Sequence, residues 1–160
     1  MTPHETFDTY MKALADALGL TLPERAEGDD VVLAIDGTEV TLHEDAAGRM
    51  VVITAEIGEM PPDEKGVFSA LALQSNYASL GTTTLSLDSE DGELFVTTSL
   101  PIALARPDAL SNAVEALVDT AEEWRQNATA FLDVDEEAAL SKAEYDEASP
   151  LSGNFEFIRV

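Results

Sequence analysis

The stretch 31–43 constrains the fold more than any other part of this chain. Two runs of alternating apolar residues are separated there only by Asp36 and Gly37. An Asp-Gly connection of two residues favours a tight hairpin turn in which both residues adopt positive φ. This turn fixes the register, so we expect Leu33 to lie opposite Val40. One face of the hairpin is then apolar and the other is mixed.

A third strand is predicted over 49–57, after a turn at 45–48, because its apolar residues again alternate. The three strands form an antiparallel meander. On its mixed face, we expect Val32, Ala34 and Val52 to lie close together. The sequence leaves open whether a helix covers this face or whether it is exposed.

The remaining segments alternate between helical and strand patterns. A helix is predicted over 2–18, because Thr2 and Glu5 form a capping box and Gly19 is a typical helix stop. A second helix is predicted over 63–80, and it is apolar on more than one side, which favours packing against a second copy of the chain. Two strands (82–88 and 93–100) and a third helix (108–132) follow. The fold class is therefore α+β.

The last 28 residues differ in composition from the rest. We expect a folded domain over 1–132 and an acidic, alanine-rich extension over 133–160, in which 133–148 is interpreted as a solvated extra helix. Residues 154–160 alternate like a strand. They are interpreted either as a segment that occupies a binding groove of the protein or as a surface tail.

Charge and composition exclude several classes of protein. The 160 residues include 32 acidic and 8 basic ones, which gives a net charge of −24. This charge repels nucleic acid and anionic lipid. The chain has no cysteine, so disulfides, cysteine-ligated metals and thiol catalysis are excluded. The N-terminus lacks a basic, apolar signal pattern, and we expect a cytoplasmic protein without membrane association.

No motif for catalysis or for a cofactor is found. His4 and His43 are the only histidines, and neither lies in a nucleophile or metal signature. The pattern of acidic residues that starts at Asp133 has the oxygen spacing of a calcium loop, but Ala138 stands where that loop needs glycine. We therefore predict no enzymatic activity, no metal and no cofactor.

Several strings, together with the order of the elements, resemble the class I chaperones of bacterial type III secretion, the Tir chaperone family. The resemblance covers about residues 3–132. The strings are Leu71-Ala72-Leu73-Gln74-Ser75-Asn76-Tyr77, the passage from Gly81 to Asp88, Asp91-Gly92-Glu93-Leu94, Ser99-Leu100-Pro101, Asp108-Ala109-Leu110 and the passage from Leu117 to Trp124.

This resemblance implies a bacterial, cytoplasmic homodimer that binds the N-terminal chaperone-binding region of a secreted effector. It places dimer contacts on the second helix and an adjacent strand, and effector contacts on the sheet. A dimeric ligand-sensing or regulatory domain of the same fold is the alternative. The expected dimer residues are Val67, Phe68, Leu71, Tyr77 and Phe95, and the expected effector-binding residues are Val32, Ala34 and Val52.

Overall fold

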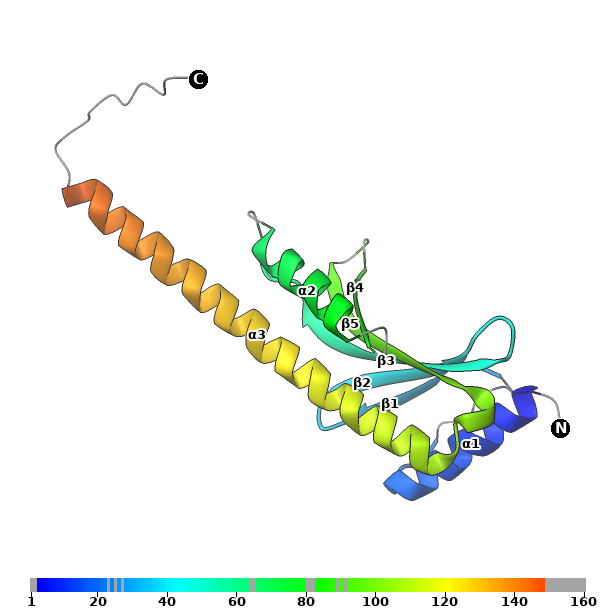
Figure 1. Cartoon of the computed structure of the whole chain (residues 1–160). Helices are drawn as coiled ribbons and strands as arrows, with labels where there is room; N and C mark the ends of the chain where they lie inside the picture. The colour runs from blue at the N-terminus through cyan, green and yellow to red at the C-terminus, as the bar shows by residue number, and fades with distance from the viewer. Residues whose placement is uncertain are drawn as a thin grey trace, which may run out of the picture.

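The computed structural model describes residues 3–22, 24, 26, 28–63, 66–79, 83–88, 90 and 92–148, with side chains described between Thr6 and Leu132. The expected α+β order of helix, three strands, helix, two strands and helix is confirmed (Figure 1). The elements are α1 (Pro3–Leu18), β1 (Val31–Ile35), β2 (Thr38–Glu44), β3 (Met50–Glu59), α2 (Val67–Ala78), β4 (Thr84–Leu87), β5 (Glu93–Pro101), the 3₁₀ helix η1 (Ile102–Leu104) and α3 (Pro107–Ala148).

The strands form one antiparallel sheet in the order β1-β2-β3-β5-β4. The register of the first hairpin is as predicted, with Leu33 opposite Val40. Asp36 (φ 49°) and Gly37 (φ 81°) both adopt the positive φ that the tight turn requires. The chain leaves β3 through α2, forms the edge strand β4, and returns as β5 into the centre of the sheet.

One face of the sheet is buried under helices and the other is open. Alternate side chains such as Leu33, Val40 and Ile53 join α1 and α3 in one apolar core. Figure 1 shows α3 running along this side of the sheet, with α1 beside its N-terminal part. The open question of the mixed face is thereby answered, because α1 covers the face of Leu33 and leaves that of Val32 exposed.

The starting point of α2 differs from the prediction. The helix begins at Val67 and not at Asp63, with Gly66 as its N-cap residue, and the side chain of Asp63 reaches its first turn from three residues before the cap. Its carboxylate accepts hydrogen bonds from the backbone N–H of Phe68 (3.1 Å) and from the backbone N–H (2.8 Å) and hydroxyl (2.7 Å) of Ser69. The two backbone N–H groups are among the donors that a helix N-terminus leaves without an internal partner.

The predicted end of the last helix near Leu132 is also wrong. α3 continues to Ala148, because the alanines, glutamates and leucine that follow favour a helix and no glycine or proline interrupts them before Pro150. The division between 1–132 and 133–160 stays a prediction. The strand pattern at 154–160 and the cap residue Thr2 lie outside the described residues.

A single arginine ties α3 to the sheet. Arg125 donates from Nε to the carbonyl oxygen of Ile57 (2.9 Å), and from Nη2 to the carbonyl oxygen of Glu56 (2.7 Å) and to Oγ1 of Thr38 (3.0 Å). The two carbonyls lie where the β3–β5 register shifts at a bulge between Glu56 and Gly58. Since a bulge disrupts the ladder, the guanidinium supplies donors that the neighbouring strand does not.

Candidate protein-binding surfaces

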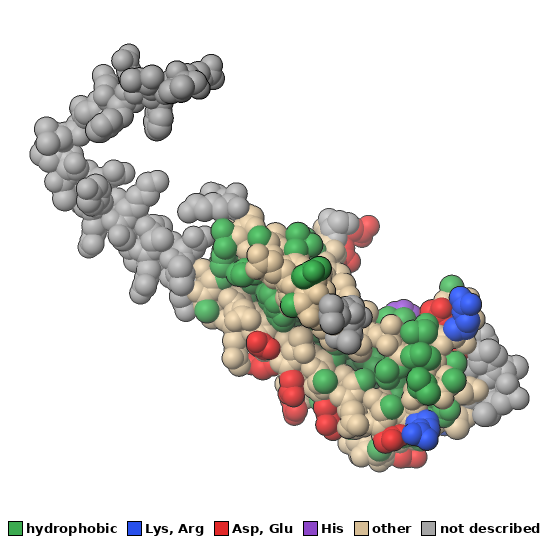
Figure 2. All heavy atoms as spheres, in the orientation of Figure 1, with side chains coloured by type: hydrophobic (Ala, Val, Ile, Leu, Met, Phe, Trp, Pro, Cys, Tyr) green, Lys and Arg blue, Asp and Glu red, His purple; other side chains and the backbone are tan. Residues whose placement is uncertain are grey.

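The outer surface of α2 is apolar and has no partner among the described residues. The helix contains no charged residue over its 12 positions, although charged residues make up 25% of the whole chain. Leu71 is 49% exposed and Tyr77 is 85% exposed, and Val67 and Leu73 are exposed beside them. Figure 2 shows hydrophobic side chains gathered over this helix. An exposed apolar helix of this kind marks a protein-binding surface.

The inner side of α2 belongs to the core of the single chain. Phe68 is 2% exposed and packs edge-on against Trp124 and Phe131 of α3, with ring centroids 5.6 Å away in both pairs. Of the predicted dimer residues, Phe68 therefore lies beneath the exposed surface, whereas Val67, Leu71 and Tyr77 lie on it. Phe68 can support an interface from below but offers it little surface of its own.

Two shallow apolar grooves flank α2. One separates α2 from α3, and the other separates α2 from β4. Both grooves extend the exposed apolar surface of α2 to its neighbours. The first is lined by Val67, Leu71, Trp124 and Phe131 among others, and the second by Met60, Leu73, Leu85, Leu87 and Leu94 among others.

The last predicted dimer residue, Phe95, lies elsewhere. It is half-buried on the open face of the sheet, opposite Ser86 and Glu56, whereas its neighbours Leu94 and Val96 point into the core. The structure therefore does not bring Phe95 onto the exposed surface of α2. The prediction joined them because the resemblance to the Tir chaperone family places dimer contacts on the second helix and on an adjacent strand.

At one edge of the sheet, α2 takes the place of a further strand. The side chain of Asn76 donates to the carbonyl oxygen of Leu85 (3.0 Å) and accepts from its backbone N–H (2.6 Å). The Ser79 hydroxyl donates to the carbonyl oxygen of Thr83 (2.6 Å). These bonds occupy backbone groups that β4 would otherwise offer to another chain.

The opposite edge, formed by β1, has no such cover. β1 is the terminal strand, and the described residues give its outer side no backbone hydrogen bond. Val32 is 46% exposed and Ala34 is also exposed, both on the open face. An open edge beside exposed apolar side chains is a place where an extended peptide can add as a strand.

Val52 lies on the same face but is not adjacent to Val32. Strand β2 separates them, with Thr41 opposite Val32 and His43 opposite Val52. The predicted effector-binding residues therefore share one face without forming one continuous apolar patch. The expectation that the three residues lie close together is therefore wrong for Val52, because Thr41 and His43 of the middle strand lie between it and Val32.

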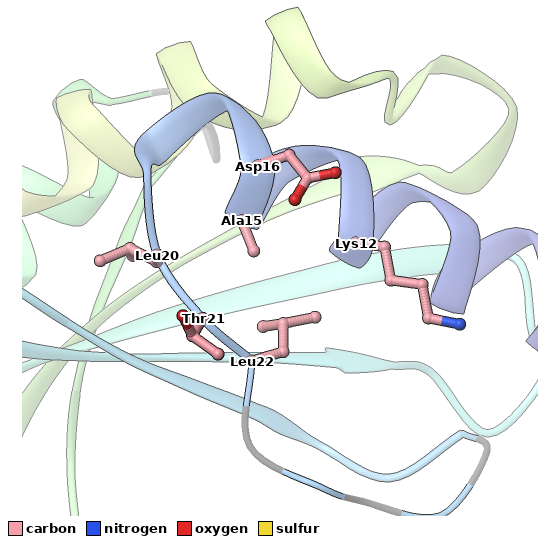
Figure 3. Close-up of a pocket in the computed structure, with 6 residues that line it drawn as sticks. All are labelled: Lys12, Ala15, Asp16, Leu20, Thr21 and Leu22. Carbon is pink, nitrogen blue, oxygen red and sulfur yellow. The ribbon is translucent and has the colours of Figure 1, made fainter.

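A third hollow lies beside α1 (Figure 3). The hollow is lined on one side by the segment that leaves the C-terminal end of α1, Leu20, Thr21 and Leu22. It is lined on the other side by three residues of the helix itself, Lys12, Ala15 and Asp16. The lining combines apolar side chains with one ammonium and one carboxylate.

Ionisation contributes to the geometry at the start of α2. Burial disfavours the charged form of Asp63, but the hydrogen bonds from Ser69 and Phe68 outweigh this effect and hold the pKa of Asp63 below its usual value. The capping arrangement therefore depends on an ionised carboxylate. Elsewhere in the described part of the chain, no group of three or more potential ligands is placed to hold a metal ion.

The sequence matches a known family. Residues 9–125 match the model of the Tir chaperone protein (CesT) family. The chain belongs to this family. The resemblance inferred from the sequence is thus confirmed, and the Tir-family match includes all five strands, α2 and the part of α3 that carries Arg125. A search of curated proteins finds no match.

Solved structures share the fold of this Tir-family member. A chain in the structure of the ExsC–ExsE complex has a TM-score of 0.67 at 19% identity, covering 80% of this chain and 97% of that one. A chain of the HopA1–SchA chaperone–effector complex has a TM-score of 0.61 at 18% identity, covering 76% and 94%. A chain in the structure of the Yersinia pestis type III secretion chaperone SycH in complex with a stable fragment of YscM2 has a TM-score of 0.58 at 22% identity, covering 76% of this chain and 98% of that one.

Two residues of this Tir-family member were not found from the sequence. Asn76 closes the β4 edge, and Arg125 holds α3 on the sheet. Arg125 is the only base between 107 and 132, which is a signal that could have singled it out. Asn76 carries no comparable signal, since an asparagine in a helix is ordinary.

No helix in the described part of the chain is long and apolar enough to cross a membrane.

Proposed function

We propose that this protein is a bacterial cytoplasmic chaperone that binds the N-terminal chaperone-binding region of a type III secreted effector. The observation that carries the proposal is the match of residues 9–125 to the Tir chaperone family. The protein acts as a homodimer and holds its client without catalysis. Its partners are the effector and a second copy of itself.

The uncharged outer surface of α2 supports dimerisation. A helix with exposed Leu71 and Tyr77 and no charge fits another apolar surface, and a twofold axis offers the same surface in a second copy. The interface includes Val67, and Phe68 supports it from beneath. Phe95 joins the interface only if the partner reaches around the sheet edge to the open face.

The β1 edge and the open face support client binding. Backbone hydrogen bonds to an added strand give affinity without a defined client sequence, and Val32 and Ala34 offer shallow apolar contacts beside that strand. Val52 extends the same face two strands further in. A client held in this way is released without breaking a covalent bond.

The test is a pull-down of the tagged protein from its native cell, followed by limited proteolysis and mass spectrometry. The expected result is one dominant partner whose protected fragment comes from its N-terminal region. Recovery of the protein with a small molecule and without a protein partner would contradict the proposal and favour a ligand-sensing domain.

A matched pair of variants locates the surface. Ala34→Lys places a charged gatekeeper on β1, and Ser86→Lys places the same side chain on the same face at the β4 edge. Ala34→Lys is expected to reduce client recovery at least tenfold, and Ser86→Lys to leave it within twofold. Equal recovery with both variants would remove β1 from the binding site.

A further inference from the structure

We propose that the chain after α3 folds back and that residues 157–160 occupy the groove between α2 and α3 of the same copy. The lining of the groove, the length of chain that follows α3 and the composition of that chain each support this contact. The proposed binding of a client at β1 does not require it.

The groove between α2 and α3 is apolar and bears no charge. None of the residues that line it is charged. Part of the lining is an aromatic cluster, in which the buried ring of Phe68 packs edge-on against Trp124 and Phe131. Trp124 and Phe131 are only half-buried, and Val67 and Leu71 are exposed. Further apolar side chains in this groove would stabilise the fold, because they remove apolar surface from water.

The chain that follows α3 has the composition of a docking segment. Residues 149–160 contain one acid and one base, so this segment is neutral in a chain of net charge −24. A neutral segment is not repelled by the acidic domain. Four of its last six residues are apolar, namely Phe155, Phe157, Ile158 and Val160.

This chain is long enough to reach the groove of its own copy. α3 continues past α2 as one helix (Figure 1), and its last residue, Ala148, lies about 26 Å beyond Phe131 and about 36 Å beyond Trp124 at 1.5 Å per residue. From Ala148, an extended chain spans about 31 Å to Phe157 and about 41 Å to Val160. Phe157 can therefore reach Phe131, and Val160 can reach Trp124.

The β1 edge of the same copy lies out of reach of a paired strand. Arg125 contacts Thr38, whose cross-strand partner Ile35 ends β1. Along α3, Arg125 lies about 35 Å before Ala148. Residues 149–153 span only about 17 Å when extended, so the strand-like stretch that follows them starts too far away to pair along β1.

Alternation along the segment matches the two walls of the groove. In an extended segment, successive side chains point to opposite sides. Phe157 and Arg159 then share one side, and Ile158 and Val160 share the other. The wholly apolar side suits α2, which has no charged residue. The side with Arg159 suits α3, which carries acids beside the groove.

One of these acids is placed to attract Arg159. Glu123 is exposed and lies one turn before Asn127, which lines the groove. With Phe157 beside Phe131, Arg159 lies about 7 Å further toward the start of α3, at the level of Asn127. Its long side chain then comes within reach of Glu123. The same carboxylate would repel a second copy of this acidic chain, so charge favours the neutral segment in the groove.

The docked segment leaves room for a second copy on α2. Leu73 is 70% exposed and Tyr77 is 85% exposed, and neither lines this groove. Val67 and Leu71 do line it and would contact both the segment and the partner. Docking of the segment and dimerisation are therefore compatible.

A spin label tests where the segment lies. The chain has no cysteine, so Glu156→Cys in the full chain gives a single attachment site for a nitroxide at the mouth of the groove. The nitroxide is expected to broaden the backbone amide NMR signals of Gln74 and Asn127 and to leave that of Val32 unchanged. In this sample, the isotopically labelled chain that carries the nitroxide is diluted with unlabelled chain that lacks it.

A mixed sample separates the two copies. It combines isotopically labelled chain that lacks the nitroxide with unlabelled chain that carries it. Groove signals that broaden only in the mixed sample would place the segment on the partner and overturn the inference. No broadening in the groove, or broadening at β1 instead, would overturn it as well.

Matched variants test the apolar contacts. Trp124 is the only tryptophan of the chain, so quenching of its fluorescence by acrylamide reports access to the groove. At concentrations where the chain is monomeric, Phe157→Ser combined with Ile158→Ser is expected to raise the quenching constant about twofold. The control Leu151→Ser, which lies before the docked residues, should leave it unchanged. Equal quenching of the variant and the control would contradict the contact.

Charge reversal tests the direction of the segment. Arg159→Glu is expected to weaken docking about threefold, measured by the loss of nitroxide broadening. Adding Glu123→Arg should restore it, whereas adding Glu115→Arg, at an exposed position nearer the start of α3, should not. Equal restoration by both would overturn the pairing of Arg159 with Glu123. Recovery of an effector by the protein does not depend on these results, so the proposed function is judged separately.

Discussion

The outer surface of α2 and the edge of β1 are both exposed, but they offer opposite kinds of contact. α2 presents apolar side chains with no charge, and its backbone is satisfied within the helix. β1 is an edge strand, and the described residues give the backbone groups on its outer side no hydrogen bond. The apolar surface of α2 favours a partner of complementary shape and a long-lived complex. The β1 edge can pair with many sequences and favours a complex that dissociates. One small domain can thus separate assembly from client binding.

The largest expected effect is the difference in stability cost between substitutions on the inner and outer sides of α2. Phe68→Ala is expected to lower the free energy of unfolding by about 3–5 kcal/mol, because it removes a ring that is buried against Trp124 and Phe131. Leu71→Ala on the outer side is expected to cost far less in the isolated chain. Urea denaturation of both variants, at concentrations where the chain is monomeric, measures the difference without the interface contribution of Leu71. A cost for Phe68→Ala no larger than that for Leu71→Ala would refute the assignment of the two sides.

Charged substitutions on the outer surface of α2 test its role in the dimer. Leu71→Glu and Tyr77→Glu are each expected to weaken the dimer at least a hundredfold, since either places an unpaired carboxylate in an apolar interface. Ser99→Glu, exposed on the open face, is the matched control and should leave the dimer intact. Light scattering gives the mass of each variant. A dimer that survives both α2 substitutions would remove this helix from the interface.

The difference between the two sheet edges depends on one side chain. Asn76→Ala leaves the backbone N–H and C=O of Leu85 without partners and is expected to cost about 1–3 kcal/mol. Hydrogen exchange at Leu85 should become faster, and β4 should then accept an added strand as β1 does. Gln74→Ala, at an exposed position of the same helix, is the control. Unchanged exchange at Leu85 would contradict the edge-closing role of Asn76.

Acid should affect the start of α2 through Asp63. Hydrogen bonds hold the pKa of Asp63 below its usual value, so the folded state gains stability from ionised Asp63 above about pH 4. This gain is lost as the pH falls through the lowered pKa of the folded state. Asp63→Asn is expected to reduce the acid sensitivity of α2. The measurement is the NMR chemical shift of the Phe68 and Ser69 backbone amides as the pH is lowered. Asp119→Asn serves as a control, and an equal effect of the two would contradict the capping role.

Much of the architecture could be predicted from the sequence because it depends on local rules. The Asp36-Gly37 turn fixes the register of the hairpin, and alternation in β3 identifies its buried side. The start of α2 could not be placed, because a carboxylate can cap a helix either from its first position or from a few residues earlier. The end of α3 was misplaced because the composition changes at residue 133 while the helical preference does not.

The candidate surfaces depend on long-range order that local patterns do not contain. The position of β5 between β3 and β4 places Phe95 opposite Glu56 and Ser86, and the apolar run Leu94-Phe95-Val96 does not reveal these neighbours. The hydrogen bonds of Asn76 and Arg125 join segments that lie 9 and 68 or 69 residues apart. Neither spacing nor hydropathy reveals such pairs, since each is set only when the sheet and helices have packed.

The length of α3 has a consequence for how the particle moves in solution. Its 42 residues form a rod of about 63 Å, whereas a compact chain of 160 residues has a radius of gyration of about 15 Å. A globule that carries such a rod diffuses more slowly and elutes earlier from a sizing column than a sphere of equal mass. A single chain can therefore elute where a spherical dimer would, and mass is better obtained from scattering or sedimentation equilibrium than from elution volume.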